Sequence, residues 1–110
     1  MKIEEAQTKV DNYISQFKEG YFPPLSNLAR LMEEIGELSR EINHLHGPKK
    51  KKSTENQENK VREELGDIFF TLVVLANQLD VKLDEALKMV IDKYNGRDLS
   101  RWNLKDKESK

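Results

Sequence analysis

The amino-acid sequence predicts an all-α fold, a bundle of four to five helices, and three observations lead to it. Along four segments, apolar residues recur at steps of three and four, which is the period of an amphipathic helix. Glycine and proline stand between these segments, at 20–24 and 47–48, where they end helices. No segment has the apolar–polar alternation of a half-buried strand. Since 110 residues leave room for one hydrophobic core, we expect a single domain over 1–110.

The first two expected helices are joined by a rigid aromatic connector at 21–24. The first helix ends near Gly20, a residue favoured just beyond helix C-termini. Two prolines stiffen the connector, because proline restricts its own backbone and that of the preceding residue. The second helix spans about 25–45. The apolar stripe of the first helix is Ile3, Ala6, Val10, Ile14 and Phe17, and that of the second is Leu28, Met32, Ile35 and Ile42.

The third expected helix spans about 58–79 and the fourth about 84–94. The second half of the third helix is apolar nearly all round, which predicts burial on several sides, in part against another subunit. The lysine-rich segment 47–57 is expected to be a flexible insert, and 103–110 a polar tail. The stripe of the third helix is Val61, Leu65, Ile68, Leu72, Leu75 and Leu79, with Phe69, Phe70, Val73 and Val74 beside it.

Composition excludes several classes of function. A net charge of −1 predicts no general attraction to nucleic acid or to anionic membranes. The absence of cysteine excludes disulfides, thiolate catalysis and cysteine-ligated metal sites. The longest apolar run, 68–76, is far shorter than the roughly 20 residues that cross a bilayer. No apolar segment typical of a signal peptide follows 1–5, so we expect a cytoplasmic protein.

Two hexapeptides, 33–38 and 63–68, share the order Glu, Glu, aliphatic, Gly, acid, aliphatic. Residues three apart are neighbours on a helix, so Glu34 lies beside Glu37 and Glu64 lies beside Asp67. With the apolar stripes facing the core, three of these four carboxylates flank buried surface, whereas Glu37 lies roughly 155° from its stripe. Antiparallel packing brings all four together if the second helix turns towards the third. The four residues are Glu34, Glu37, Glu64 and Asp67.

Gly36 and Gly66 occupy matching places in the two copies. Glycine within a helix costs roughly 1 kcal/mol relative to alanine, and clustered carboxylates repel one another. We therefore expect a compensating cation at the carboxylates and a close approach of backbones or of a ligand at the glycines. Four oxygen ligands without nitrogen or sulfur suit a hard divalent cation, Mg²⁺ first and Mn²⁺ as a substitute.

A plain solvated surface is the alternative reading of the acidic residues. Glutamate is common on exposed helix faces, and Arg30 and Lys60, one turn before Glu34 and Glu64, are in reach as counter-charges. The repetition of the motif and its paired glycines favour a cation site, which would process phosphates because magnesium commonly binds substrate phosphates as well. Such a cation would polarise a phosphoryl oxygen and lower the pKa of a bound water.

The order E-E-x-x-E followed by E-x-x-D resembles the signature of the MazG-like, all-α nucleoside-triphosphate pyrophosphohydrolases. The resemblance runs from about Pro24 to Trp102 and is closest to small single-domain bacterial members of the YpjD type. These have a similar P-L-x-x-x-A-R-L-x-E-E-x-G-E-L stretch, at 24–38 here, and a similar N-x-R-D-x-x-R-W, at 95–102 here. A departure is the long insert at 47–57, which leaves the ligand spacings intact.

The resemblance implies magnesium-dependent cleavage of nucleoside triphosphates, canonical or damaged, to the monophosphate and pyrophosphate. It implies that Glu34, Glu37, Glu64 and Asp67 are metal ligands and that Glu33 assists catalysis, with Glu63 a weaker candidate. It also implies a homodimer or homotetramer. By the same resemblance, and because arginine suits phosphate oxygens, the expected substrate-binding residues are Lys93, Asn95, Arg97, Arg101 and Trp102.

Other features have simpler interpretations. Four lysines at 49–52 are typical of a solvated loop, although they also suit polyphosphate, and no aromatic residues are interleaved with them for nucleic-acid binding. His44 and His46 point to different sides of a helix and fit a helix end better than a zinc site. Trp102 and the pair Tyr21-Phe22 either stack on a nucleobase or pack against a neighbouring helix.

Two alternative functions remain open from sequence alone. One is a related enzyme, phosphoribosyl-ATP pyrophosphohydrolase, which would have the same acidic motifs. The other is a non-catalytic helical interaction module whose acidic face binds a basic partner. The second alternative predicts oligomerisation without any response to magnesium or nucleotide, and it leaves the two glycines without a purpose.

Overall fold

The computed structural model describes residues 1–46, 57–97 and 104–105, and within these ranges the chain is all-α, as predicted. The four helices are α1 (Ile3–Ser15), α2 (Pro24–His46), α3 (Gln57–Gln78) and α4 (Leu83–Asn95). Each lies within a few residues of its expected range. No helix among the described residues is both long enough and apolar enough to cross a membrane.

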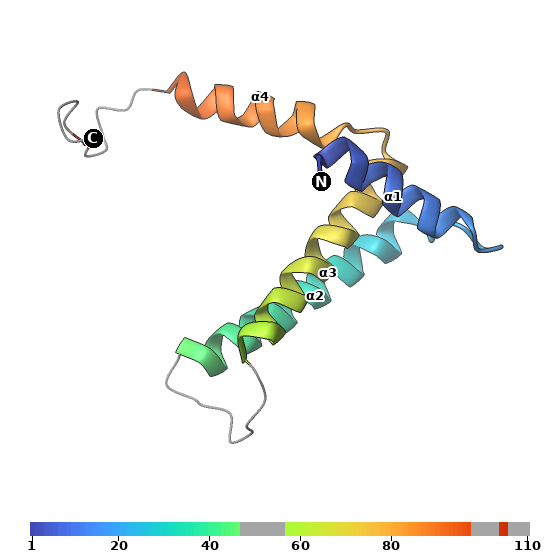
Figure 1. The fold of residues 1–110 in the computed structure, drawn as a ribbon, viewed down its shortest axis with the longest axis horizontal. Helices are drawn as coiled ribbons and strands as arrows, with labels where there is room; N and C mark the ends of the chain where they lie inside the picture. The colour runs from blue at the N-terminus through green and yellow to red at the C-terminus, as the bar shows by residue number, and fades with distance from the viewer. Residues whose placement is uncertain (47–56, 98–103, 106–110) are drawn as a thin grey trace.

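Helices α2 and α3 form a long antiparallel hairpin that makes up most of the molecule (Figure 1). Helix α1 crosses one end of the hairpin, and α4 begins at that same end and extends away from it. The radius of gyration is 18.3 Å, compared with about 13 Å for a compact domain of this length. The single chain is therefore open rather than compact.

The hydrophobic core lies where α1 crosses α3. It consists of Val10, Val73 and Val74, with Ile14, Tyr21, Phe70 and Leu83 packed around them. In the described part of the chain, Ala76 is the one further buried apolar residue. Such a small core fits a chain that completes its packing with another molecule.

Amide side chains fasten α1 and the connector to α3. Asn77 accepts a hydrogen bond of 3.0 Å from Gln7 and donates one of 3.2 Å to the Tyr21 hydroxyl. That hydroxyl donates to Asp11 over 2.7 Å. Gly20 precedes Tyr21 with φ = 63°, a left-handed conformation that glycine adopts without strain. These bonds hold the connector against the end of the hairpin.

The orientation of α2 differs from the expectation. Its predicted apolar stripe does not face the core: Met32 is 68% exposed, and Leu28, Ile35 and Ile42 are exposed as well. A mixed side of α2 faces α3 instead: Asn27 and Glu41 are buried on it, and Leu31 and Leu38 are half-buried between them. Leu65, Leu72 and Leu79 of α3 are likewise exposed. The expectation that the stripes mark the interior of one chain was therefore wrong for α2. It holds for most of the α1 stripe, and on α3 it holds for Val61, Ile68 and Leu75, which are half-buried.

Candidate functional site

Three carboxylates meet at the interface of α2 and α3. Glu34, Glu37 and Glu64 each offer one carboxylate oxygen, and these three atoms all lie within 4.8 Å of one another. Glu34 and Glu37 are one turn apart on α2, and Glu64 faces them from α3. We call these three residues the glutamate cluster.

The rotation of α2 explains why Glu37 belongs to the cluster. A wheel centred on the apolar stripe directs Glu37 away from the interior, but that stripe is itself exposed. The side of α2 that carries Glu34 and Glu37 therefore meets α3. Glu37 remains solvent-exposed while Glu34 and Glu64 are half-buried, so the cluster is open to solvent on one side.

The cluster holds more negative charge than its surroundings neutralise. The pKa of Glu64 is raised to about 7, first by burial of its carboxyl group and then by the charge and hydrogen bonding of Glu37 and Glu34. The Oε2 atoms of Glu34 and Glu64 are buried and have no hydrogen-bond partner among the described residues. Leaving a buried polar atom unpaired costs about 1–3 kcal/mol. A bound cation would satisfy both oxygens and remove the repulsion.

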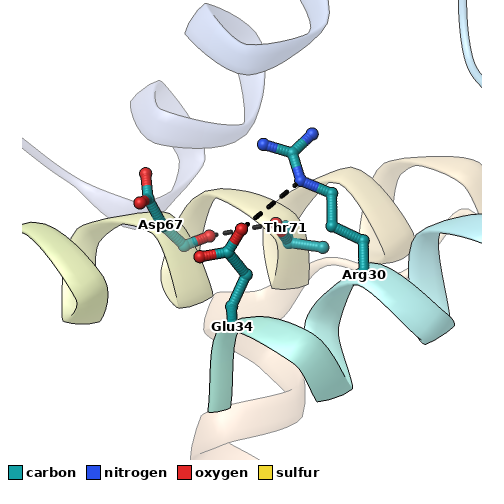
Figure 2. Close-up of polar contacts among 4 residues, drawn as sticks. All are labelled: Arg30, Glu34, Asp67 and Thr71. Atoms are coloured by element: carbon teal, nitrogen blue, oxygen red, sulfur yellow. Dashed lines mark hydrogen bonds and ion pairs between the residues drawn. The ribbon is translucent and has the colours of Figure 1, made fainter. Parts of the chain in front are cut away.

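Among the described residues, Arg30 is the positive side chain that forms an ion pair with the glutamate cluster. Its Nε lies 3.7 Å from Oε1 of Glu34, one helical turn away (Figure 2). The Arg30 side chain is 52% exposed, whereas that of Glu34 is 14% exposed. At this distance and exposure the pair contributes little stability, and it leaves the second oxygen of Glu34 unsatisfied.

Asp67, the fourth expected ligand, lies one turn beyond Glu64 but outside the group of three. Figure 2 shows its carboxylate turned away from that of Glu34. Its main-chain carbonyl accepts a hydrogen bond of 3.0 Å from the Thr71 hydroxyl, which holds the next turn of α3 in place. Three of the four expected ligands thus converge, and the role of Asp67 remains a prediction.

The other expected site residues are not at the cluster. Glu33 and Glu63 are exposed and outside the group of three. Lys93, Asn95 and Arg97 are exposed at the end of α4, which extends away from the hairpin (Figure 1). The guanidinium carbon of Arg97 lies 4.4 Å from the centre of the Tyr94 ring. Arg101 and Trp102, like the lysines at 49–52, lie outside the described residues.

An aromatic cavity of about 340 Å³ lies at the corner between α1, the connector and α3. Arg30 forms part of its wall, so one side chain borders both this cavity and the glutamate cluster. Burial and the hydrogen bond to Asp11 raise the pKa of the Tyr21 hydroxyl, which keeps it protonated and able to donate. The side chains that give the cavity its aromatic character are those of Tyr13, Phe17, Tyr21, Phe22 and Phe70.

The cavity is held in shape by Asn27, the buried residue at the start of α2. Its Nδ2 donates to the Phe22 carbonyl over 3.1 Å and to Oε1 of Gln78 over 2.9 Å. Gln78 also donates to the Phe22 carbonyl, over 2.5 Å. Sequence reasoning assigned no role to Asn27 and did not foresee the cavity, because residues from α1, the connector, α2 and α3 together build it. One hint of the cavity was present in the sequence, the pair Tyr21-Phe22, which was a candidate for stacking on a nucleobase and lines the cavity.

The two motif glycines do not mark close packing within the chain. A Cβ added at Gly36 or Gly66 would meet no described atom within 4 Å outside its immediate helical surroundings. Gly66 lines a separate apolar groove of about 460 Å³ between α1 and α3. The expected close approach of the two backbones is therefore wrong, and approach of a ligand or of another chain remains a prediction.

Comparison with known proteins places this geometry in context. Residues 22–102 match the model of the MazG nucleotide pyrophosphohydrolase domain. The chain is 53% identical over 104 residues to the uncharacterised protein YpjD of Bacillus subtilis (strain 168), covering 94% of this chain and 93% of that protein.

Two crystal structures have the same fold. The structure of YPJD from Bacillus subtilis, a candidate pyrophosphatase, gives a TM-score of 0.80 at 53% identity and covers 86% of this chain and 96% of that one. A Bacillus-conserved MazG protein, a nucleotide pyrophosphohydrolase, gives a TM-score of 0.74 at 41% identity, over 98% of this chain and 96% of that one. These matches favour an enzyme over a non-catalytic interaction module.

Proposed function

The chain is a member of the MazG nucleotide pyrophosphohydrolase family, and from this we propose that it hydrolyses nucleoside triphosphates to the monophosphate and pyrophosphate with Mg²⁺. A cytoplasmic housecleaning enzyme that removes damaged nucleotides fits this reaction. The observation that carries the proposal is the glutamate cluster, with two buried carboxylate oxygens that lack a hydrogen-bond partner among the described residues.

The donor atoms of the cluster fit a hard divalent cation. Enzymes of this family generally depend on a divalent metal, and all three cluster residues offer carboxylate oxygen. Oxygen donors favour Mg²⁺, with Mn²⁺ as a substitute, over the metals that prefer histidine or thiolate. Glu34, Glu37 and Glu64 would hold the ion, and Asp67 would join them after a change of side-chain rotamer. When bound, the ion supplies polarisation of a phosphoryl oxygen and activation of water.

The protein side chains have separate tasks in this reaction. The glutamate cluster would hold the cation that neutralises the phosphate chain, and Glu33, the exposed neighbour of Glu34, is a candidate for orienting water at the open side. Arg30 supplies positive charge where negative charge accumulates during phosphoryl transfer. Water attacks the phosphorus next to the nucleoside, the bond from this phosphorus to the bridging oxygen of the next phosphate breaks, and pyrophosphate leaves.

The aromatic cavity is our candidate for the nucleobase. Its volume of about 340 Å³ lies in the usual range of small-molecule sites, and its aromatic walls suit a planar ring. The cavity shares Arg30 with the neighbourhood of the cluster, so a nucleotide can extend from one to the other. Tyr21 and Phe22, which line it, are the stacking candidates within the described residues.

A homodimer or homotetramer completes the proposed enzyme. The exposed apolar residues of α2 and α3 repeat at heptad spacing, which is the pattern of helices that pack in a bundle. Apolar patches of more than a few hundred Å² are rare on monomers. In such an assembly the α4 helix of one chain has room to bring Lys93, Asn95 and Arg97 to the phosphates of another, with Arg101 and Trp102 following. The exposed repeat is Leu25, Leu28, Met32, Ile35 and Ile42 on α2, and Leu65, Phe69, Leu72 and Leu79 on α3.

The direct test is release of pyrophosphate from a panel of nucleotides. Purified protein is incubated with canonical, oxidised and deaminated nucleoside triphosphates and with phosphoribosyl-ATP, each with Mg²⁺, with Mn²⁺ or with a chelator. We expect pyrophosphate and monophosphate in equal amounts, and none with the chelator. Release of inorganic phosphate instead, or no turnover of any compound, would contradict the proposal. Preference for phosphoribosyl-ATP would identify the related biosynthetic enzyme.

A further inference from the structure

We propose that Arg30 binds the phosphate attached to the nucleoside, the α-phosphate, and releases Glu34 to the metal when it does so. This inference rests on the proposed function and names a further substrate-contacting residue for it. The four expected metal ligands are all carboxylates; Arg30 lies in the stretch shared with YpjD-type proteins at 24–38, where it was given no role in binding substrate. The argument comes from the position of Arg30, its free donors and the weakness of its present contact.

Arg30 lies between the aromatic cavity and the glutamate cluster, which are the proposed sites of the base and of the metal. On one side its Nε lies 3.7 Å from Oε1 of Glu34, a member of the glutamate cluster. On the other side its side chain forms part of the wall of the aromatic cavity, together with Asn27 and Phe70. If the base occupies the cavity and the metal occupies the cluster, the phosphate next to the nucleoside lies between them, beside this guanidinium.

The donors of Arg30 are available for that phosphate. Figure 2 shows the two terminal guanidinium nitrogens directed away from the Glu34 carboxylate. No hydrogen bond among the described residues uses either of them, and the side chain is 52% exposed. Two parallel N–H groups in a planar fork match the oxygens of a phosphate, which a lysine ammonium does not reproduce.

The present contact with Glu34 is easily exchanged. A pair at 3.7 Å between a half-exposed arginine and a carboxylate one turn away contributes little to stability. Metal binding at the cluster competes for the same carboxylate. The backbone beneath Arg30 stays in place, because Asn27 ties the first turns of α2 to the connector and to α3. The guanidinium can therefore move from Glu34 to phosphate without any movement of the helix.

The test separates phosphate binding from support of Glu34. Arg30→Ala and Arg30→Lys are compared with the unmodified protein by calorimetry, with three titrants: Mg²⁺ alone, a nucleoside monophosphate with Mg²⁺, and pyrophosphate with Mg²⁺. We expect Arg30→Ala to weaken monophosphate binding about 10- to 100-fold, and Arg30→Lys to recover only part of this. Pyrophosphate binding should stay within about twofold, and Mg²⁺ alone should bind equally well or more tightly, since a competing positive charge is gone.

Lys88→Ala is the matched control. Lys88 forms an ion pair of the same i, i+4 type with Asp92 on α4, at 2.6 Å. Its loss should leave all three titrations unchanged. Weaker Mg²⁺ binding by Arg30→Ala with unchanged monophosphate binding would overturn the inference, because it would mean that Arg30 only orients Glu34. Equal loss of monophosphate and pyrophosphate binding would also overturn it. Failure of the unmodified protein to bind any nucleotide would instead contradict the proposed function itself.

Discussion

The two sides of the α2–α3 hairpin differ in chemistry. Where the helices face each other, polar and charged residues are buried or half-buried among leucines, and these include Asn27, Glu41 and two members of the glutamate cluster, Glu34 and Glu64. On its outer surface the hairpin exposes large apolar side chains, such as Met32 and Leu79. A chain that folded only to bury its own apolar surface would not leave large apolar side chains exposed while placing carboxylates between its helices. The cation of the proposed function would account for the inner side, and the second chain of the proposed assembly would account for the outer side.

The largest expected effect concerns the inner, polar side. Glu64→Gln keeps the shape of the side chain but removes its charge from the cluster. We expect pyrophosphate release to fall by about 100- to 1,000-fold, the usual cost of losing one electrostatic element of an active site. Steady-state kinetics with Mg²⁺ measure this. Glu63→Gln is the matched control, since Glu63 is the preceding residue and is exposed; equal losses in both variants would contradict the assignment.

The next effect concerns the outer, apolar side. Met32→Lys puts a charge into the exposed apolar repeat, where desolvating it in an interface is costly. We expect the variant to shift to monomers in light scattering at micromolar concentration and to melt several degrees lower. Met89→Lys is the control, because Met89 is 67% exposed, nearly the same as Met32, but lies on α4 and outside the exposed apolar repeat of α2 and α3. A monomeric unmodified protein would show that the outer surface has another purpose.

A pH titration tests whether the carboxylates on the inner side of the hairpin repel one another. The pKa of Glu64 is raised to about 7 in the folded chain, above its ordinary value of 4.5, so the folded state binds the proton more tightly than the unfolded state does. Stability from this group is therefore present at low pH and is lost as pH rises from about 4.5 to about 7. Without metal, the melting temperature should fall over this range relative to Glu64→Gln.

Saturating Mg²⁺ should remove this trend, since the cation favours the ionised carboxylate. Thermal melts at pH 5, 6, 7 and 8, with chelator or with Mg²⁺, measure both effects. If the unmodified protein and Glu64→Gln follow parallel curves in chelator, the carboxylates do not repel one another as described.

The smallest effect concerns Gly36, a motif glycine with open space around it in the single chain. Alanine is the better helix former by about 1 kcal/mol, so Gly36→Ala should raise the free energy of unfolding slightly and leave activity unchanged. Chemical denaturation and a kinetic assay measure both. Lower stability, or loss of activity, would reveal a ligand or second chain that approaches the helix at Gly36.

The sequence was informative about the elements because their signals are local. Helical periodicity and the glycine and proline positions predicted all four helices to within a few residues. The repeated motif predicted that Glu34, Glu37 and Glu64 would meet, and they do. It did not predict which side of α2 faces α3. An apolar stripe indicates a buried surface, but it does not say whether the same chain or another one buries it.

The helices and the pairing of the acidic residues follow from residue order, because spacing along a helix determines which side chains are neighbours. The pyrophosphohydrolase family was indicated by the resemblance of the acidic motif and is shown by the match of residues 22–102. Three features depended on the tertiary structure: the rotation of α2, the separation of Asp67 from the cluster, and the aromatic cavity that shares Arg30 with it. Each depends on the relative placement of elements far apart in sequence. That placement is decided by the summed packing and hydrogen bonds between elements, and no local pattern encodes it.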